Sequence, residues 1–171
     1  GFENGFAPNG VAFYWTGFNN GGRATYGYYD EMWPPVVSQG SHGQLLEINT
    51  KNLPDGADPD RVIGIAQGVY LQPGATYQLS FDAMMREAPL ATDEDPYRYE
   101  VLWGYSTTGS TDTTLMTYKQ LAPLTTIYPR TEPGAMQPYT TQFTAPGGHA
   151  TLAIWGLMKW AMLNRELDVN L

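Results

Sequence analysis

The residues of this chain that could do chemistry stand out first at its two ends. The chain opens with GFENGF and closes with ELDVNL, so that Glu3 and Asp168 each lie in a short apolar stretch. A carboxylate beside a hydrophobic core costs several kcal/mol unless it has a partner. The candidate partners are a cationic side chain and a metal ion, and either acid could instead cap a turn.

Residues that suit catalysis are few. The chain has two His residues, His42 and His149, and each lies beside Gly in a turn-like context. It has no Cys, which excludes thiol catalysis, disulfides and zinc–thiolate sites. No Gly-x-Ser-x-Gly elbow, His-x-x-x-His pair or phosphate-binding Gly-rich motif occurs in the sequence. The sequence therefore predicts a protein that is not an enzyme.

Composition restricts the class of partner. The formal net charge is -8 and the nine basic residues are scattered, which argues against nucleic-acid binding. Aromatic residues make up 13% of the chain and charged residues only 15%, a mix that suits a neutral, flat and partly polar ligand. No apolar run of about 18 residues could span a bilayer, so we expect no membrane insertion.

The elements that must position these residues are strands. Alternating or apolar runs recur at 43–50, 61–71, 76–86, 97–107, 139–145 and 149–158, with Gly- and Pro-rich turns between them. Helical periodicity is nearly absent, with one short candidate, MKWAMLNREL, near the end. The chain at 17–37 holds Gly pairs, a Pro pair and several aromatics, which predicts long loops over one face or end of the fold. Together these patterns predict one all-β domain over 1–171, an antiparallel β-sandwich with two sheets.

Four stretches carry a resemblance to a known family. GFENGF, VVSQGSHGQLLEI, GIAQGVYLQPGATYQLSFDAMMR and the closing LDVNL resemble, in this order, the jelly-roll (galactose-binding-like) carbohydrate-binding modules of secreted bacterial polysaccharide-degrading or cell-surface proteins. The resemblance implies a jelly roll that is secreted or displayed on the bacterial surface and belongs to a larger multidomain protein. It implies a non-catalytic function, tethering that protein to a polysaccharide.

The resemblance also implies a cofactor. In such modules the two chain ends pair, and a structural calcium ion often lies there. Carried onto this chain, its ligands would be Glu3, Asp168 and backbone carbonyls around Ser41 and His42, because calcium takes six to eight hard oxygen ligands. Leu167 departs from the family, many members of which have an Asp there, and this removes one ligand. Pairing of Glu3 and Asp168 with Arg remains the alternative.

Sugars are held by aromatic rings on their flat faces and by polar side chains around their hydroxyls. We expect Leu152 and Ile154 to lie in the core, which would turn Trp155 outward. The candidate ligand-binding residues are Tyr28, Trp33, Gln78, Asp82, Arg86, Arg98, Glu100, Trp155 and Trp160. The alternatives are that the aromatics are core or edge residues, and that the four charged residues form a solvated ion-pair cluster.

Two other functions remain open at this point. The first is a structural or adhesive sandwich with no sugar site. The second, less favoured, is a small polysaccharide-active glycosidase or lyase. Asp82 and Glu100 could face each other across adjacent strands, and glycoside hydrolysis needs carboxylates about 5 Å apart or about 6.5–9.5 Å apart.

Overall fold

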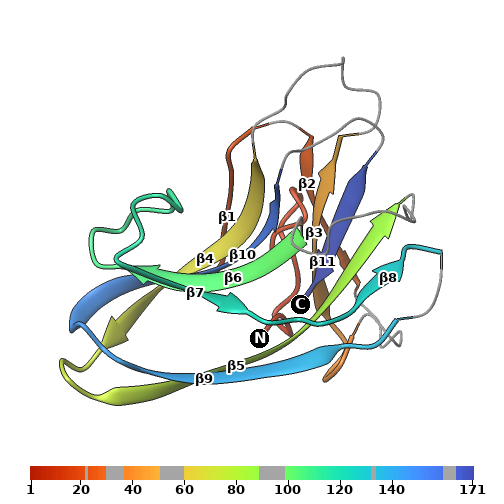
Figure 1. Ribbon diagram of the computed structural model, residues 1–171. Coiled ribbons are helices and arrows are strands. Elements are labelled where there is room, and N and C mark those ends of the chain that lie inside the picture. Colours follow the sequence, from red (N-terminus) through yellow and green to blue (C-terminus); the bar gives the residue numbers. More distant parts are fainter. Residues whose placement is uncertain (22, 30–36, 51–59, 89–98, 132–133, 160–164) are drawn as a thin grey trace.

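The fold is described from a computed structural model that covers residues 1–171 except 22, 30–36, 51–59, 89–98, 132–133 and 160–164. The described residues form eleven strands and no helix (Figure 1). Accordingly, this part of the chain contains no helix that could cross a membrane. The strands are β1 (Thr16–Asn19), β2 (Ala24–Tyr29), β3 (Gly43–Asn49), β4 (Arg61–Leu71), β5 (Thr76–Ala88), β6 (Tyr99–Ser106), β7 (Tyr118–Ala122), β8 (Ile127–Pro129), β9 (Gln137–Thr144), β10 (Gly148–Met158) and β11 (Glu166–Asn170).

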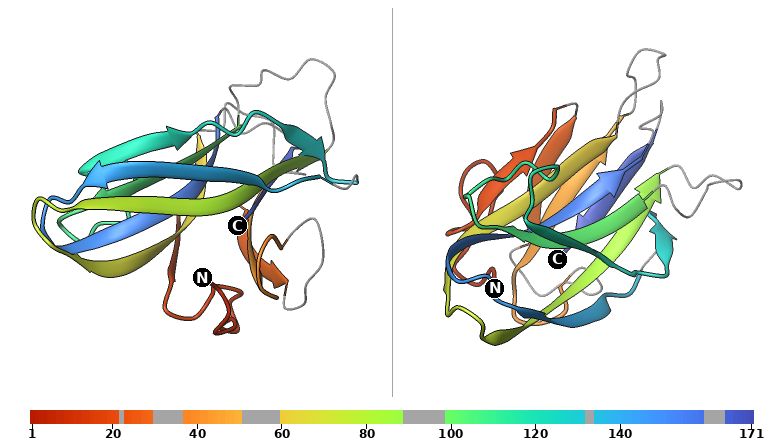
Figure 2. Two further views of the ribbon diagram at one scale, coloured as in Figure 1. Left: turned by 90° about the horizontal axis from the view of Figure 1, so that it is seen from below. Right: turned by 60° about the vertical axis from the view of Figure 1, so that its left-hand side comes forward.

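The strands form two facing sheets, as the sequence predicts. The first sheet has the order β1-β4-β10-β6-β7, and the second has the order β2-β3-β11-β5-β8, with β9 pairing β5. All pairs are antiparallel except β5 with β8. Figure 2 shows the two layers from below and from one side. The all-β sandwich class is confirmed, whereas the prediction of loops throughout 17–37 is wrong, because β1 ends and β2 lies within this segment.

The core lies between the two sheets and follows from the alternation of side chains along each strand. On β3 and β11 the inward positions include Leu46, Ile48, Leu167 and Val169, all within the main buried cluster. Trp103 is also fully buried there, and its indole Nε1 donates to the Tyr139 hydroxyl at 2.9 Å. The opposite positions of β3 and β11 therefore lie on the outer face of the second sheet.

A second buried cluster covers the outer face of the first sheet and corrects one prediction. Trp155 does point away from Ile154, but it is only 2% exposed, because it packs with Val62 and Ala66 under partly buried neighbours such as Phe18. A buried indole cannot stack on a sugar, so the prediction that Trp155 is an outward ligand platform is wrong.

Candidate functional sites

An open groove of about 810 Å³ lies beside the first half of β5. It exists because β5 is much longer than β11. Residues 84–88 of β5 pair with β11, whereas residues 76–83 pair only with β9, on the other side. Strand β11 ends at Asn170, so among the described residues no strand pairs with residues 76–83 on the side of β5 that faces β11. The groove occupies this place and extends to the N-terminal segment.

The walls of the groove combine aromatic rings with polar groups, two of which, Glu3 and Asp82, are carboxylates. Phe81 and Tyr139 contribute rings whose centroids lie 5.1 Å apart, and Phe2 and Trp15 a second pair 5.9 Å apart. The residues that line it are Gly1, Phe2, Glu3, Trp15, Ser38, Gln39, Gly40, His42, Gln67, Leu79, Ser80, Phe81, Asp82, Pro138, Tyr139, Thr140, Leu152, Ile154 and Leu171. No Lys or Arg is among these described lining residues. Such a surface suits a neutral ligand with apolar faces and many hydroxyls.

Of the predicted ligand-binding residues that the structure describes, Asp82 is the one that lines this groove. Its Oδ2 accepts a hydrogen bond of 2.6 Å from the Ser38 hydroxyl, which holds the carboxylate in one orientation. Gln78 lies four residues earlier on the same outer face of β5, is exposed, and donates to the Ser80 hydroxyl at 3.1 Å. Gln78 is therefore outside the groove but next to it.

Glu3 forms one wall of the groove and accepts hydrogen bonds from a turn. The backbone N–H groups of Ser41 and His42 donate to its carboxylate at 3.1 and 3.2 Å, and the Ser41 hydroxyl donates at 3.1 Å. His42 Nδ1 lies 3.1 Å from Glu3 Oε2, and this hydrogen bond, followed by those from Ser41, lowers the pKa of Glu3 to about 2. Glu3 therefore caps this turn by accepting hydrogen bonds from its N–H and hydroxyl groups.

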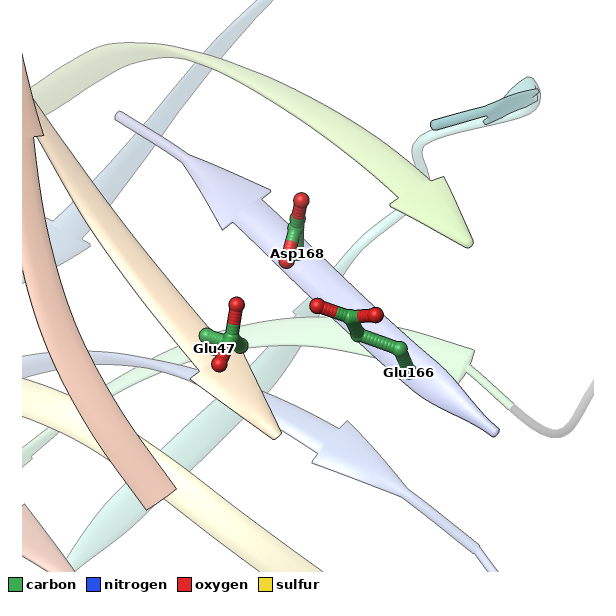
Figure 3. Close-up of side chains that lie close together, drawn as sticks. All are labelled: Glu47, Glu166 and Asp168. Carbon is green, nitrogen blue, oxygen red and sulfur yellow. The ribbon is translucent and has the colours of Figure 1, made fainter. Parts of the chain in front are cut away.

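The second candidate site is a cluster of three carboxylates on the outer face of the second sheet. We call Glu47, Glu166 and Asp168 the acidic cluster. Glu47 of β3 lies opposite Asp168 of β11, and Glu166 is two residues before Asp168 on the same face. Figure 3 shows the three side chains converging from these two strands. One oxygen from each lies within 4.8 Å of the others.

Two arginines balance most of the charge of the acidic cluster. Arg130 bonds Glu166, lies 3.1 Å from Asp168 through Nε, and lies 3.3 Å from Glu47 through a terminal nitrogen. Arg86, on β5, is 3.7 Å from Asp168. The Arg partner that the sequence left as an alternative for Asp168 is therefore present.

Burial changes the protonation of this cluster. Asp168 is 1% exposed, and desolvation raises its pKa to about 6 even though Arg130 and Arg86 favour its charged form. Desolvation likewise raises the pKa of Glu166 to about 7, helped by neighbouring Glu47. Desolvation opposes the charge on Arg130, but the three carboxylates outweigh it and raise the Arg130 pKa.

The acidic cluster could hold a metal ion, since carboxylates are the ligands that hard divalent cations prefer. Two observations fit an additional ligand there. Within the part of the chain that the structure describes, the buried Asp168 Oδ1 accepts no hydrogen bond, and the buried Asn170 amide, two residues along on the same face, has no hydrogen-bond partner either. A bound cation would have to replace Arg130.

The predicted joint site of Glu3 and Asp168 is wrong. Asp168 lies opposite Glu47, which is five residues beyond His42, or about 16 Å of extended chain. In addition, Ser41 and His42 offer N–H donors to Glu3, and these repel a cation. The two acids belong to separate sites.

The remaining predicted residues are dispersed. Tyr28 is 49% exposed on β2, and its ring stacks on Phe6 at 4.5 Å. Arg86 belongs to the acidic cluster, and Glu100 bonds Lys159 on the first sheet. Asp82 is on the second sheet, so it does not face Glu100 across adjacent strands, and the alternative of one ion-pair cluster that contains both acids is excluded. Trp33, Arg98 and Trp160 lie outside the described residues.

Sequence reasoning missed Glu47, Glu166 and Arg130. The two acids had a usable signal, because Glu47 is an outward position of a clear strand and Glu166 shares the parity of Asp168. Arg130 had none, because it follows the short strand β8, and its place against β11 is set by tertiary structure.

Comparison with known proteins gives no match from which the role of either site could be inferred. No family model matches the chain, and no similar curated protein or solved structure was found. The groove and the acidic cluster are therefore the features from which a function can be inferred.

Proposed function

We propose that this domain is a non-catalytic carbohydrate-binding module that holds a neutral polysaccharide in the groove beside β5. The groove itself is the observation that carries the proposal. It places aromatic rings, hydroxyls, amides and two oriented carboxylates, Asp82 and Glu3, around one open volume. The resemblance of the sequence to secreted bacterial modules agrees with this function, and with a role in tethering a larger secreted or cell-surface protein.

The physical basis of binding is a preformed surface. Phe81 and Tyr139 are fixed by packing against the core, and Asp82 is fixed by Ser38, so binding orders few protein groups. Low ordering cost matters for sugars, because each hydroxyl exchanges a bond to water for a bond to protein and gains little.

The charge of the groove favours neutral over acidic polysaccharides. Its ionisable lining residues are Glu3, Asp82 and His42, and the pKa of Glu3 is lowered to about 2, so its carboxylate is ionised at neutral pH. A polymer of uronic acids would place like charges beside these carboxylates, which is unfavourable.

The two rival functions have weaker support. A purely structural sandwich would not need an open aromatic groove beside a truncated sheet. A glycosidase needs two carboxylates that can reach substrate, one of which donates a proton. In the acidic cluster, Asp168 is 1% exposed and Arg130 bonds the other two acids. In the groove, Glu3 accepts hydrogen bonds from Ser41 and His42, and its pKa of about 2 makes it unsuited to donate a proton.

We also propose calcium as the ion of the acidic cluster, because its ligands are oxygens only. The ion would stabilise the sandwich by joining β3 to β11. A melting temperature measured with millimolar CaCl₂ and with EDTA tests this. We expect a rise with calcium that is larger in Arg130→Ala, where the competing cation is gone. Equal melting temperatures in both buffers, for both proteins, would exclude the ion.

The sugar proposal is tested by isothermal titration with neutral glucans, xylans and mannans, with polygalacturonate as the acidic comparison. We expect binding to at least one neutral polymer and none to polygalacturonate. Asp82→Asn should weaken it about tenfold, because a charge-assisted hydrogen bond becomes a neutral one. Asp112→Asn, on an exposed turn away from the groove, is the matched control and should change nothing. No binding to any neutral polymer would refute the proposal.

A further inference from the structure

The outer face of the β5–β9 pair carries a feature that the groove does not explain. Six exposed side chains, all uncharged and all able to form hydrogen bonds, lie there in two rows, which we call the polar ladder. Its members are Thr76, Gln78 and Ser80 on β5, and Thr144, Gln142 and Thr140 on β9.

The rows are in strict register. Thr76 lies opposite Thr144, Gln78 opposite Gln142, and Ser80 opposite Thr140. The hydroxyls of Ser80 and Thr140 are 3.2 Å apart. Another part of this sheet differs, because on the same outer face the pair β3–β11 carries the acidic cluster. The polar ladder is thus an uncharged strip on a protein whose net charge is -8.

The polar ladder is continuous with the groove. Ser80 and Thr140 belong to both, and the next pair in the register, Asp82 with Pro138, also lines the groove. From Asp82 to Thr76 the strand extends six residues, or about 20 Å. A ligand that leaves the groove past Ser80 and Thr140 would therefore meet Gln78 and Gln142 next.

We propose that the polar ladder binds the continuation of the polysaccharide chain whose first units occupy the groove, so that the domain recognises extended internal segments of a neutral polymer. This inference rests on the proposed function. The lack of charge matches a neutral polymer, and paired hydroxyls and amides offer donors and acceptors to successive sugar hydroxyls. Because the groove and the polar ladder are both open to solvent, the polymer can bind by an internal segment and need not present a chain end.

The test is affinity as a function of ligand length. Oligosaccharides of two to eight units, prepared from whichever neutral polymer binds, are titrated into the intact chain and into the double variant Gln78→Ala/Gln142→Ala. For the intact chain we expect affinity to rise beyond the length that fills the groove. The double variant should bind short oligosaccharides normally and long ones about tenfold more weakly, equivalent to two lost hydrogen bonds. Thr16→Ala, exposed on β1 of the other sheet, is the control.

The outcomes separate this inference from the proposed function. Binding of short oligosaccharides with no gain from length, or equal affinities of the double variant and the intact chain for long ones, would overturn the polar ladder and leave the groove standing. No binding at any length would overturn both. A melting temperature within a few degrees of the intact chain verifies that the double variant is folded, and Gln142→Ala alone is the milder variant if it is not.

Discussion

Deprotonation of the acidic cluster should make the domain less stable as the pH rises from about 4.5 to about 7. The pKa of Glu166 is raised from 4.5 to about 7 and that of Asp168 from 3.8 to about 6, chiefly by desolvation. The folded state therefore binds these protons more tightly than the unfolded state. For acids shifted in this direction, stability is highest when they are protonated and falls as the pH passes through the folded pKa values.

The magnitude follows from the shift. One pKa unit corresponds to about 1.4 kcal/mol, so the shift of Glu166 corresponds to about 3 kcal/mol. Water reaches the cluster past Arg130, whose side chain is 40% exposed, and screening reduces this figure to roughly 1.5 kcal/mol. Glu166→Gln removes the titrating group while keeping an acceptor for Arg130.

Urea denaturation followed by tryptophan fluorescence at pH 4.5, 5.5, 6.5 and 7.5 measures the effect. The intact chain should lose stability over this range, and Glu166→Gln should lose about 1.5 kcal/mol less. Asp112→Asn is a control, because its pKa is lowered and it titrates below this window. Stability that is flat or rises between pH 4.5 and 7.5, with the same profile in both proteins, would refute the reasoning.

Two further predictions concern residues outside the acidic cluster. Glu3→Ala should speed amide hydrogen exchange at Ser41 and His42, because their N–H groups lose the acceptor that Glu3 supplies, and unchanged exchange would contradict the capping role. Trp155→Ala should destabilise the domain by about 3–5 kcal/mol, since it leaves a cavity among Val62, Ala66 and Ala153. The affinity of the folded variant for sugar should nevertheless stay unchanged. A loss of affinity in the folded variant would show that Trp155 binds the ligand, as the sequence had predicted.

The fold class could be predicted from sequence because alternation directly reports strands that bury one face. The runs predicted as strands at 43–50, 61–71 and 76–86 agree with β3, β4 and β5. Alternation failed at β1 and β2, which are edge strands with no buried position, and β2 is rich in Tyr. Such strands carry little apolar contrast between their faces.

The sites were harder to predict because each depends on which strands become neighbours. Alternation correctly placed Trp155 opposite Ile154, but it could not show that Phe18 and Met116 would cover it. Similarly, the groove exists because β11 ends at Asn170 while β5 continues, which is a property of sheet topology. The sequence predicted Asp82 as a polar outward residue. That it lines a groove could not be predicted, because the groove depends on the strand order.

The central claim is that sugar occupies the groove beside β5, and chemical-shift mapping of the ¹⁵N-labelled domain tests it most directly. A saturating neutral oligosaccharide should shift the amide signals of residues 38–42, 79–82 and 139–140 and the indole signal of Trp15. Shifts confined to other surfaces, such as Tyr28 with Phe6 or the acidic cluster, would contradict the account.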